Sequence, residues 1–275
     1  LFSYGWKLMC SSLIDTVYNN LYTMVIGKIY QKDVVGYYNR GNQFPQLIVN
    51  NLAASIQAVM LPAFSASQED RDRMKAMVRR SIVTSAFVVF PMMAGLIAVA
   101  KPLISIILTE EWLPCVPFLQ IMCVAYAMWP IHIANLQAIN ALGRSDIFLK
   151  LEIVKKVLGL LVLAVSIPFG IYAMVWLKAA TDFAGTIINS YPNKKLLDYS
   201  FTEQWRDVFP ALLLSVIMGG AVYSIQFLIH NNWLLLITQI LTGIVVYAGL
   251  SWLFKVESFK YLVGMVKRGR KKSAL

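Results

Sequence analysis

Charged residues are scarce in this sequence, and their scarcity excludes a soluble protein. Of the 275 residues only 14% are charged, whereas 58% are apolar, and the mean hydropathy is +0.62. A soluble domain needs about 25% charged residues to cover its surface, and a disordered chain combines low hydrophobicity with high charge. The composition therefore predicts a protein whose solvent is the lipid bilayer.

Cysteine is also rare, and the common catalytic and cofactor motifs are absent. The three cysteines, Cys10, Cys115 and Cys123, have neither a CxxC spacing nor a histidine partner, which excludes a disulfide framework and a metal site. The sequence contains no GxxxxGK[ST] phosphate loop and no HExxH metal motif. Its uncharged runs leave only short loops, without room for a soluble catalytic domain. We therefore predict no enzymatic activity, no cofactor and no nucleic-acid partner.

Long uncharged runs predict an all-α, polytopic membrane protein. Twenty uncharged residues separate Arg80 from Lys101, which is enough for one membrane helix. Pro168-Phe169-Gly170 and His230-Asn231-Asn232 interrupt two further runs, and we interpret both interruptions as turns between helices. The predicted eight transmembrane helices cover approximately residues 5–28, 42–65, 81–100, part of 112–143, 149–168, 171–190, 208–229 and 233–254.

The distribution of positive charge predicts the orientation of these helices. Nineteen Lys and Arg residues fall in 66–80, 141–156, 191–206 and 255–275, whereas the opposite connections hold four. Loops rich in Lys and Arg stay in the cytoplasm, so both ends of the chain are predicted to be cytoplasmic. The basic tail 255–275 is expected to contact anionic lipid headgroups.

Ionisable residues inside the predicted spans are candidates for function, because burying them in lipid is costly. Asp15 lies midway along the first span. Lys178 and Asp182 are four residues apart, so they are either a self-neutralised pair or part of a polar cavity wall. Arg40 is either a phosphate ligand or an interfacial residue whose aliphatic stem lies along apolar surface. His132 is expected to be a hydrogen-bonded packing residue, with a switch as the alternative.

The first two spans carry an unusual number of amide side chains. A membrane helix with polar groups on one side is expected to face a wet cavity and not lipid. Combined with the ionisable positions, this reasoning gives the candidate substrate-binding residues Asp15, Asn19, Asn20, Arg40, Asn50, Asn51, Lys178 and Asp182.

Several stretches, taken in order along the chain, resemble the polysaccharide transporter family. This family contains the lipopolysaccharide and O-antigen flippases of the multidrug/oligosaccharidyl-lipid/polysaccharide exporter superfamily. The matching stretches are Asp15-Thr16-Val17-Tyr18-Asn19-Asn20, Gly36-Tyr37-Tyr38-Asn39-Arg40-Gly41-Asn42-Gln43-Phe44-Pro45, Trp112-Leu113-Pro114-Cys115-Val116-Pro117, Ala141-Leu142-Gly143-Arg144-Ser145-Asp146 with Lys150-Leu151-Glu152, and Ile167-Pro168-Phe169-Gly170.

The resemblance implies a two-lobe transporter with a central cavity, of which this chain is the C-terminal portion. Residues 1–190 would form the second six-helix lobe and 191–206 a cytoplasmic linker. Residues 207–254 would form a helical hairpin of two extra spans, followed by the tail 255–275. The N-terminal lobe is missing from this arrangement, and transport requires that it be supplied.

The resemblance also implies an activity, namely moving an undecaprenyl-diphosphate-linked oligosaccharide across the bacterial inner membrane for lipopolysaccharide or polysaccharide biosynthesis. The expected partners are that lipid-linked oligosaccharide, membrane lipids and a coupling ion, H⁺ or Na⁺, carried by Asp15 or Asp182. Arg40 or Lys178 would bind the diphosphate. The alternatives are a cation-coupled multidrug antiporter of the same superfamily and a membrane fragment that does not transport.

Overall fold

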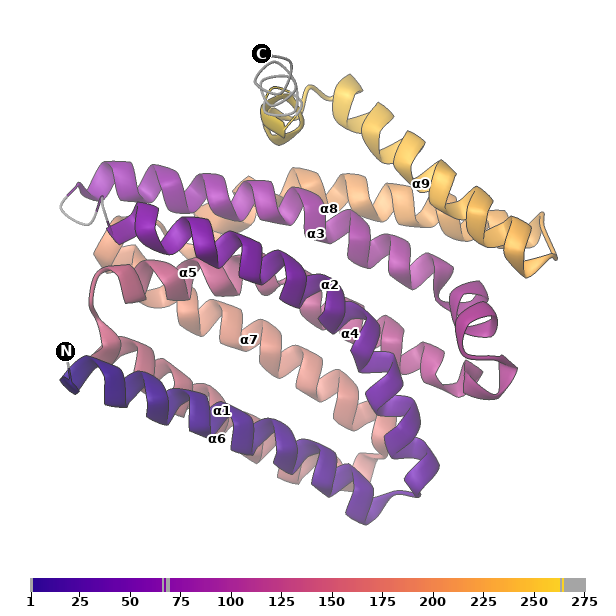
Figure 1. Cartoon of the computed structure of the whole chain (residues 1–275), viewed down its shortest axis with the longest axis horizontal. Helices are drawn as coiled ribbons and strands as arrows, with labels where there is room; N and C mark the ends of the chain where they lie inside the picture. Colours follow the sequence, from indigo (N-terminus) through magenta and orange to yellow (C-terminus); the bar gives the residue numbers. More distant parts are fainter. Residues whose placement is uncertain (1, 66, 68–69, 263, 265–275) are drawn as a thin grey trace.

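The computed structural model describes the backbone of residues 2–65, 67, 70–262 and 264. Within these ranges, the side chains of residues 2–5, 7, 8, 11, 12, 14, 15, 19, 53, 55–59, 61, 62 and 65 are not described. The described residues form α-helices joined by turns and short 3₁₀ segments, without strands (Figure 1). The α-helices are α1 (Phe2–Ile29), α2 (Lys32–Ser65), α3 (Arg71–Ile107), α4 (Val116–Ala127), α5 (Trp129–Ala141), α6 (Ser145–Ser166), α7 (Ile171–Leu197), α8 (Phe201–Ser224) and α9 (Asn232–Leu253).

The predicted all-α, polytopic membrane fold is confirmed. Among the residues that the structure describes, five helical segments are long and apolar enough to cross a bilayer: Arg71–Ile107, Glu110–Ala141, Ile171–Leu197, Phe201–Phe227 and Asn232–Leu253. Three further helices, α1, α2 and α6, have 28, 34 and 22 residues. Even the shortest of them is about 33 Å long, sufficient for a hydrocarbon core of about 30 Å.

Local sequence signals end the helices where the turns were expected. The 3₁₀ segment η2 (Ile167–Phe169) follows α6, and Gly170 has φ = 88°, a conformation that glycine adopts without a steric penalty. At the start of α9, the Asn231 side chain accepts hydrogen bonds from the backbone N–H groups of Trp233 and Leu234. Both interruptions are therefore helix boundaries, as predicted.

Two predicted spans have internal or terminal detail that the sequence did not indicate. The span predicted within 112–143 corresponds to the candidate membrane segment Glu110–Ala141, which is divided into η1 (Glu110–Cys115), α4 and α5. Pro130 lies in the first turn of α5, where its missing N–H cannot continue the hydrogen bonding of α4. Helix α7 continues to Leu197 and not only to residue 190, because Ser190 and Asn193 are buried against neighbouring helices.

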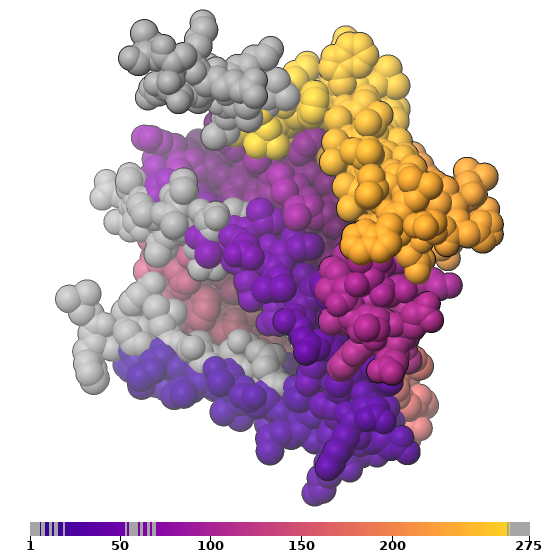
Figure 2. Space-filling view, turned by 45° about the vertical axis from the view of Figure 1, so that its right-hand side comes forward, coloured from indigo at the N-terminus to yellow at the C-terminus, as the bar shows by residue number. Residues whose placement is uncertain are grey.

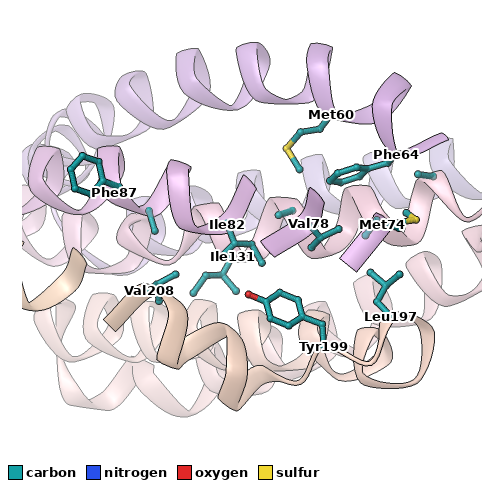
Figure 3. Close-up of a cluster of buried hydrophobic side chains, with 14 of the residues drawn as sticks. Met60, Phe64, Met74, Val78, Ile82, Phe87, Ile131, Leu197, Tyr199 and Val208 are labelled. Carbon is teal, nitrogen blue, oxygen red and sulfur yellow. The ribbon is translucent and has the colours of Figure 1, made fainter. Parts of the chain in front are cut away.

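The largest apolar cluster lies where α3 packs against α8 and α5. Figure 3 shows Val78 and Ile82 of α3 beside Ile131 of α5 and Val208 of α8, and all four are fully buried. Helix α9 packs against α3 and α8 at the edge of the molecule opposite α1 (Figures 1 and 2). The α8–α9 hairpin is therefore attached to the rest of the protein mainly through α3.

On the other side of the molecule, two groups of helices are joined through α7. Helix α2 packs against α4 and α5, whereas α6 packs against α1 and α7, and α7 also packs against α4 and α5. Gly159 permits the close approach of α6 to α1, because a Cβ atom at this position would overlap the hydroxyl of Tyr18. The space between the two groups is where the candidate site lies.

Candidate substrate-binding cavity

A cavity of about 640 Å³ lies between α1, α2, α4, α5, α6 and α7. In a membrane protein, a cavity of this kind is where polar side chains escape contact with lipid. Among the side chains that the structure describes, the polar and charged ones that line it are Tyr18, Tyr22, Thr23, Tyr38, Asn39, Asn42, Gln46, Asn50, Tyr126, Trp129, His132, Gln137, Asn140, Glu152, Lys155, Lys156, Lys178, Thr181, Asp182 and Thr186.

The charged groups of the cavity come from α6 and α7. The Nζ atom of Lys178 is 2.7 Å from Oδ2 of Asp182, and Nζ of Lys155 is 2.5 Å from Oε1 of Glu152. With Lys156, the described lining residues carry three lysines and two carboxylates. The Lys178 side chain is 17% exposed and that of Asp182 is 41% exposed, so Asp182 is the more accessible member of the pair. The described part of the lining is therefore cationic.

Two tyrosines of α1 lie against these lysines. The ammonium group of Lys156 is 4.4 Å from the ring centroid of Tyr18, and that of Lys178 is 5.9 Å from that of Tyr22. At such distances an aromatic face attracts a cation. The hydroxyl of Tyr22 also donates a hydrogen bond to the carbonyl oxygen of Met174, at 3.2 Å. These contacts hold the lysines at the wall formed by α1, α6 and α7.

Helix α2 contributes a different kind of wall. Its polar lining residues are Asn39, Asn42, Gln46 and Asn50 beside Tyr38, and none of these side chains is charged. Asn39, Asn42 and Gln46 also line a second, more open pocket of about 560 Å³ with Arg40, Gln43 and Trp112. There the Arg40 guanidinium donates a hydrogen bond of 2.9 Å to Gln43 and lies 5.5 Å from the Trp112 ring centroid.

The structure brings three of the predicted site residues into the cavity, namely Asn50, Lys178 and Asp182. The two alternatives for Lys178 and Asp182 both apply, because they form an ion pair and also line the cavity. Arg40 lies in the neighbouring open pocket.

The other predicted residues are not brought into the cavity by the side chains that the structure describes. Asn20 and Asn51 are exposed, and each donates a hydrogen bond to a carbonyl of its own helix, that of Thr16 and of Leu47 respectively. Asp15 and Asn19 are on α1, but their side chains lie outside the described part of the chain.

Sequence reasoning missed the charged residues of α6. Lys155 and Lys156 were assigned to the basic cytoplasmic connection 141–156, although both lie beyond the first turn of the predicted span 149–168. Glu152 was noted only as part of a family resemblance. The spacing of Glu152 and Lys155, three residues apart on a helix, was a signal for a buried pair. This spacing did not stand out, because a basic cytoplasmic connection already accounted for the lysines.

His132 is held by its neighbours, as expected of a packing residue. Its ring stacks on that of Trp129, with centroids 5.1 Å apart, and the Asn189 amide is 3.0 Å from Nδ1. His132 also lines the cavity, so the alternative role stays open. In the described residues, no group of three or more His, Cys, Asp or Glu side chains is arranged to hold a metal ion.

Outside the spans, ionisable side chains stabilise the turns that connect the helices. At the start of α6, hydrogen bonds from the Arg144 guanidinium lower the pKa of Asp146 to about 2, so this ion pair persists through the physiological range. Between α7 and α8, burial raises the pKa of Tyr199, whose hydroxyl donates a hydrogen bond to Asp207. Asp207 in turn accepts two hydrogen bonds from Arg79 of α3, at 2.8 and 2.7 Å.

Comparisons with known proteins agree with this architecture. A family model described as polysaccharide biosynthesis protein matches residues 1–117. The chain is 26% identical to the lipopolysaccharide biosynthesis protein WzxC of Escherichia coli over 152 residues, which cover 55% of this chain and 31% of that protein. It is 20% identical over 273 residues to Agl15 of Haloferax volcanii, described as a probable low-salt glycan biosynthesis flippase, with 97% and 57% of the two chains covered.

Among solved structures, the fold is similar to that of the lipid II flippase MurJ in an inward-closed conformation. The TM-score is 0.76 at 19% sequence identity, and the match covers 92% of this chain and 53% of MurJ. The protein is thus a multi-pass membrane protein whose fold is similar to that of MurJ. The resemblance to polysaccharide transporters expected from the sequence is confirmed. The chain spans about half the length of most of the curated relatives that it matches.

Proposed function

We propose that this chain forms the second lobe of a flippase for undecaprenyl-diphosphate-linked oligosaccharide in the bacterial inner membrane. The observation that carries the proposal is the cavity, which brings three lysines and a row of amide side chains together within a membrane-spanning fold. The relatives connected with glycan biosynthesis support this choice of substrate class. In this arrangement both ends of the chain are cytoplasmic, as the charge bias of the connections indicates.

The cavity supplies hydrogen-bond partners that such a substrate cannot find in lipid. A glycan carries many hydroxyl groups, and each costs free energy when it leaves water without a new hydrogen-bond partner. The amides and hydroxyls of the lining offer such partners, while the lysines offer charge-assisted hydrogen bonds to a diphosphate. The polyprenyl tail remains in the bilayer.

A second bundle of helices completes the cavity in this proposal. Alternating access requires two bundles that move around one site, and this chain corresponds to about half of MurJ. The face of α2 that carries Arg40, Gln43, Gln46, Asn50 and Asn51 is exposed. Because a face this polar is costly in contact with lipid, we propose that the N-terminal lobe of a longer protein, or another chain, lies opposite it. We assign a role in ion coupling to Asp182, the more exposed member of its pair.

The balance of charge favours this substrate over the cation of a multidrug antiporter. A site for organic cations is expected to present more carboxylates than ammonium groups, because like charges repel. The described lining has more ammonium groups than carboxylates.

The proposal is tested by replacing Lys178 in cells whose surface polysaccharide depends on this protein. The readout is the fraction of lipid-linked oligosaccharide that periodate, added outside intact spheroplasts, can oxidise. We expect the double variant Lys178→Met with Asp182→Asn, which leaves no unpaired charge, to lower this fraction at least about tenfold, because charge-assisted hydrogen bonds are lost. Lys194→Met, at an exposed position of the same helix, is the control and should have no effect. Equal accessibility in the double variant and the unmodified protein, at equal membrane levels, contradicts the proposed function.

A further inference from the structure

The two sides of the cavity differ in chemistry. Every charged side chain in the described lining belongs to α6 or α7. The polar groups that α2 contributes are the neutral amides of Asn39, Asn42, Gln46 and Asn50, with the phenol of Tyr38. Charged and neutral hydrogen-bonding groups are therefore separated between two walls.

The two walls lie on opposite sides of α4 and α5. Helix α2 packs against α4 and α5, and α7 also packs against them, while α6 is attached to α1 and α7 (Figure 1). The four amides of α2 are spaced by three, four and four residues, so they follow one face of the helix. With a rise of about 1.5 Å per residue, this stripe extends about 16 Å from Asn39 to Asn50.

The stripe also leads out of the cavity. Asn39, Asn42 and Gln46 belong both to the cavity and to the open pocket beside it, where Arg40 and Trp112 are found. One row of amides therefore connects the cavity with the more open pocket beside it.

An amide side chain suits one kind of ligand in particular. It has two N–H donors and a carbonyl acceptor, so it can both donate to and accept from a hydroxyl group. Asn39, Gln46 and Asn50 are exposed, and exposed amides on a membrane-crossing helix are stable only where water or a hydroxyl-rich ligand surrounds them. A diphosphate has no donors to match the carbonyl half of each amide.

We propose that the α2 stripe, Asn39, Asn42, Gln46 and Asn50, is a carbohydrate-binding track that extends from the cavity to the open pocket. The substrate is then oriented across the cavity, with its glycan along α2 and its anionic linkage against the lysines of α6 and α7. This inference rests on the proposed function, since it assigns the two halves of one substrate to two walls.

Neighbouring residues of α2 provide a matched pair of variants for the test. Asn50 lines the cavity, whereas Asn51 lines neither pocket and donates to the Leu47 carbonyl. The purified whole chain in detergent is titrated calorimetrically with two probes. One is the oligosaccharide released by mild acid from the lipid carriers of the expressing cells, and the other is geranyl diphosphate. Asn50→Leu combined with Gln46→Leu should weaken oligosaccharide binding about tenfold or more, because several hydrogen bonds are lost. Binding of geranyl diphosphate should change less than about twofold, and Asn51→Leu should change neither.

The complementary variant, Lys178→Met with Asp182→Asn, should weaken geranyl diphosphate binding and leave oligosaccharide binding intact. The inference is overturned if the unmodified chain binds no oligosaccharide at millimolar concentration, or if the α2 variants bind it normally. It is also overturned if both pairs of variants weaken both probes equally. These outcomes are separate from those of the periodate assay. If the α2 variants lose oligosaccharide binding as expected, but Lys178→Met with Asp182→Asn leaves periodate accessibility unchanged, the flippase function is contradicted and the carbohydrate track stands.

Discussion

Two groups of polar side chains in this protein use the same residue types for different purposes. One is a buried amide network between α5, α7 and the start of α8, made by Asn135, Ser190, Asn193 and Gln204, all of which are fully buried. Asn135 and Gln204 exchange two hydrogen bonds, of 2.7 and 3.0 Å, and Asn193 donates a third, of 2.6 Å, to Asn135. The network joins three helices.

The second group, the cavity lining, has the opposite character. Asn50 and Gln46 are exposed, and Asp182 is open on one side. A polar group whose hydrogen bonds are made within the protein fixes the packing of helices, whereas one that faces open space keeps its capacity for a ligand. The contrast teaches that burial and partners, and not the residue type, distinguish a structural amide from a binding one.

The largest expected effect comes from breaking the buried network. Gln204→Leu removes two hydrogen bonds with Asn135 and further ones with Ser190 and the Tyr199 carbonyl. We expect a loss of about 2–3 kcal/mol in the free energy of unfolding, because buried partners are left unsatisfied. Unfolding in mixed micelles, followed by circular dichroism, measures it. A stability equal to that of the unmodified protein would show that the network does not join the helices.

An intermediate effect is expected where the cavity wall depends on close packing. Gly159→Val inserts side-chain atoms where Tyr18 now lies against α6, and we expect a loss of about 1–3 kcal/mol from overpacking. Because Tyr18 lines the cavity, Gly159→Val should also weaken the binding of geranyl diphosphate. Gln204→Leu should leave this binding unchanged at temperatures where the variant remains folded. Gly95→Val, at a helical glycine where an added Cβ meets nothing within 4 Å, is the control.

The smallest effect on stability, but a diagnostic one on binding, is expected for Asp182→Asn. The Asp182 side chain is 41% exposed, and Lys178 lines the cavity, where water can solvate the ammonium group that is left unpaired, so the free energy of unfolding should fall by only about 1 kcal/mol. The ammonium group of Lys178 loses its acidic competitor, so binding of geranyl diphosphate should become tighter and not weaker. Calorimetric titration decides the sign, and weaker binding would contradict a role of Lys178 as an anion ligand.

The candidate site was only partly predictable from the sequence, for reasons that individual residues illustrate. Lys178 and Asp182 were found because charge within an apolar run is conspicuous and a spacing of four residues places both side chains on one face. Asn50 and Asn51 are adjacent and were indistinguishable by composition, and only the position of α2 against α4 and α5 separates them. The lysines of α6 were missed because a basic connection and a cavity wall show the same composition.

By itself, the sequence determined the class of this protein and most of its helices. A chain with so little charge can satisfy its backbone in a bilayer only by forming helices, and proline, glycine and asparagine mark several of their ends. Only the tertiary structure decided which polar residues meet. The direction in which a helix face points depends on the helices packed around it, and a cavity arises from contacts between residues far apart in the chain, such as Tyr18 with Gly159 and Asn135 with Gln204.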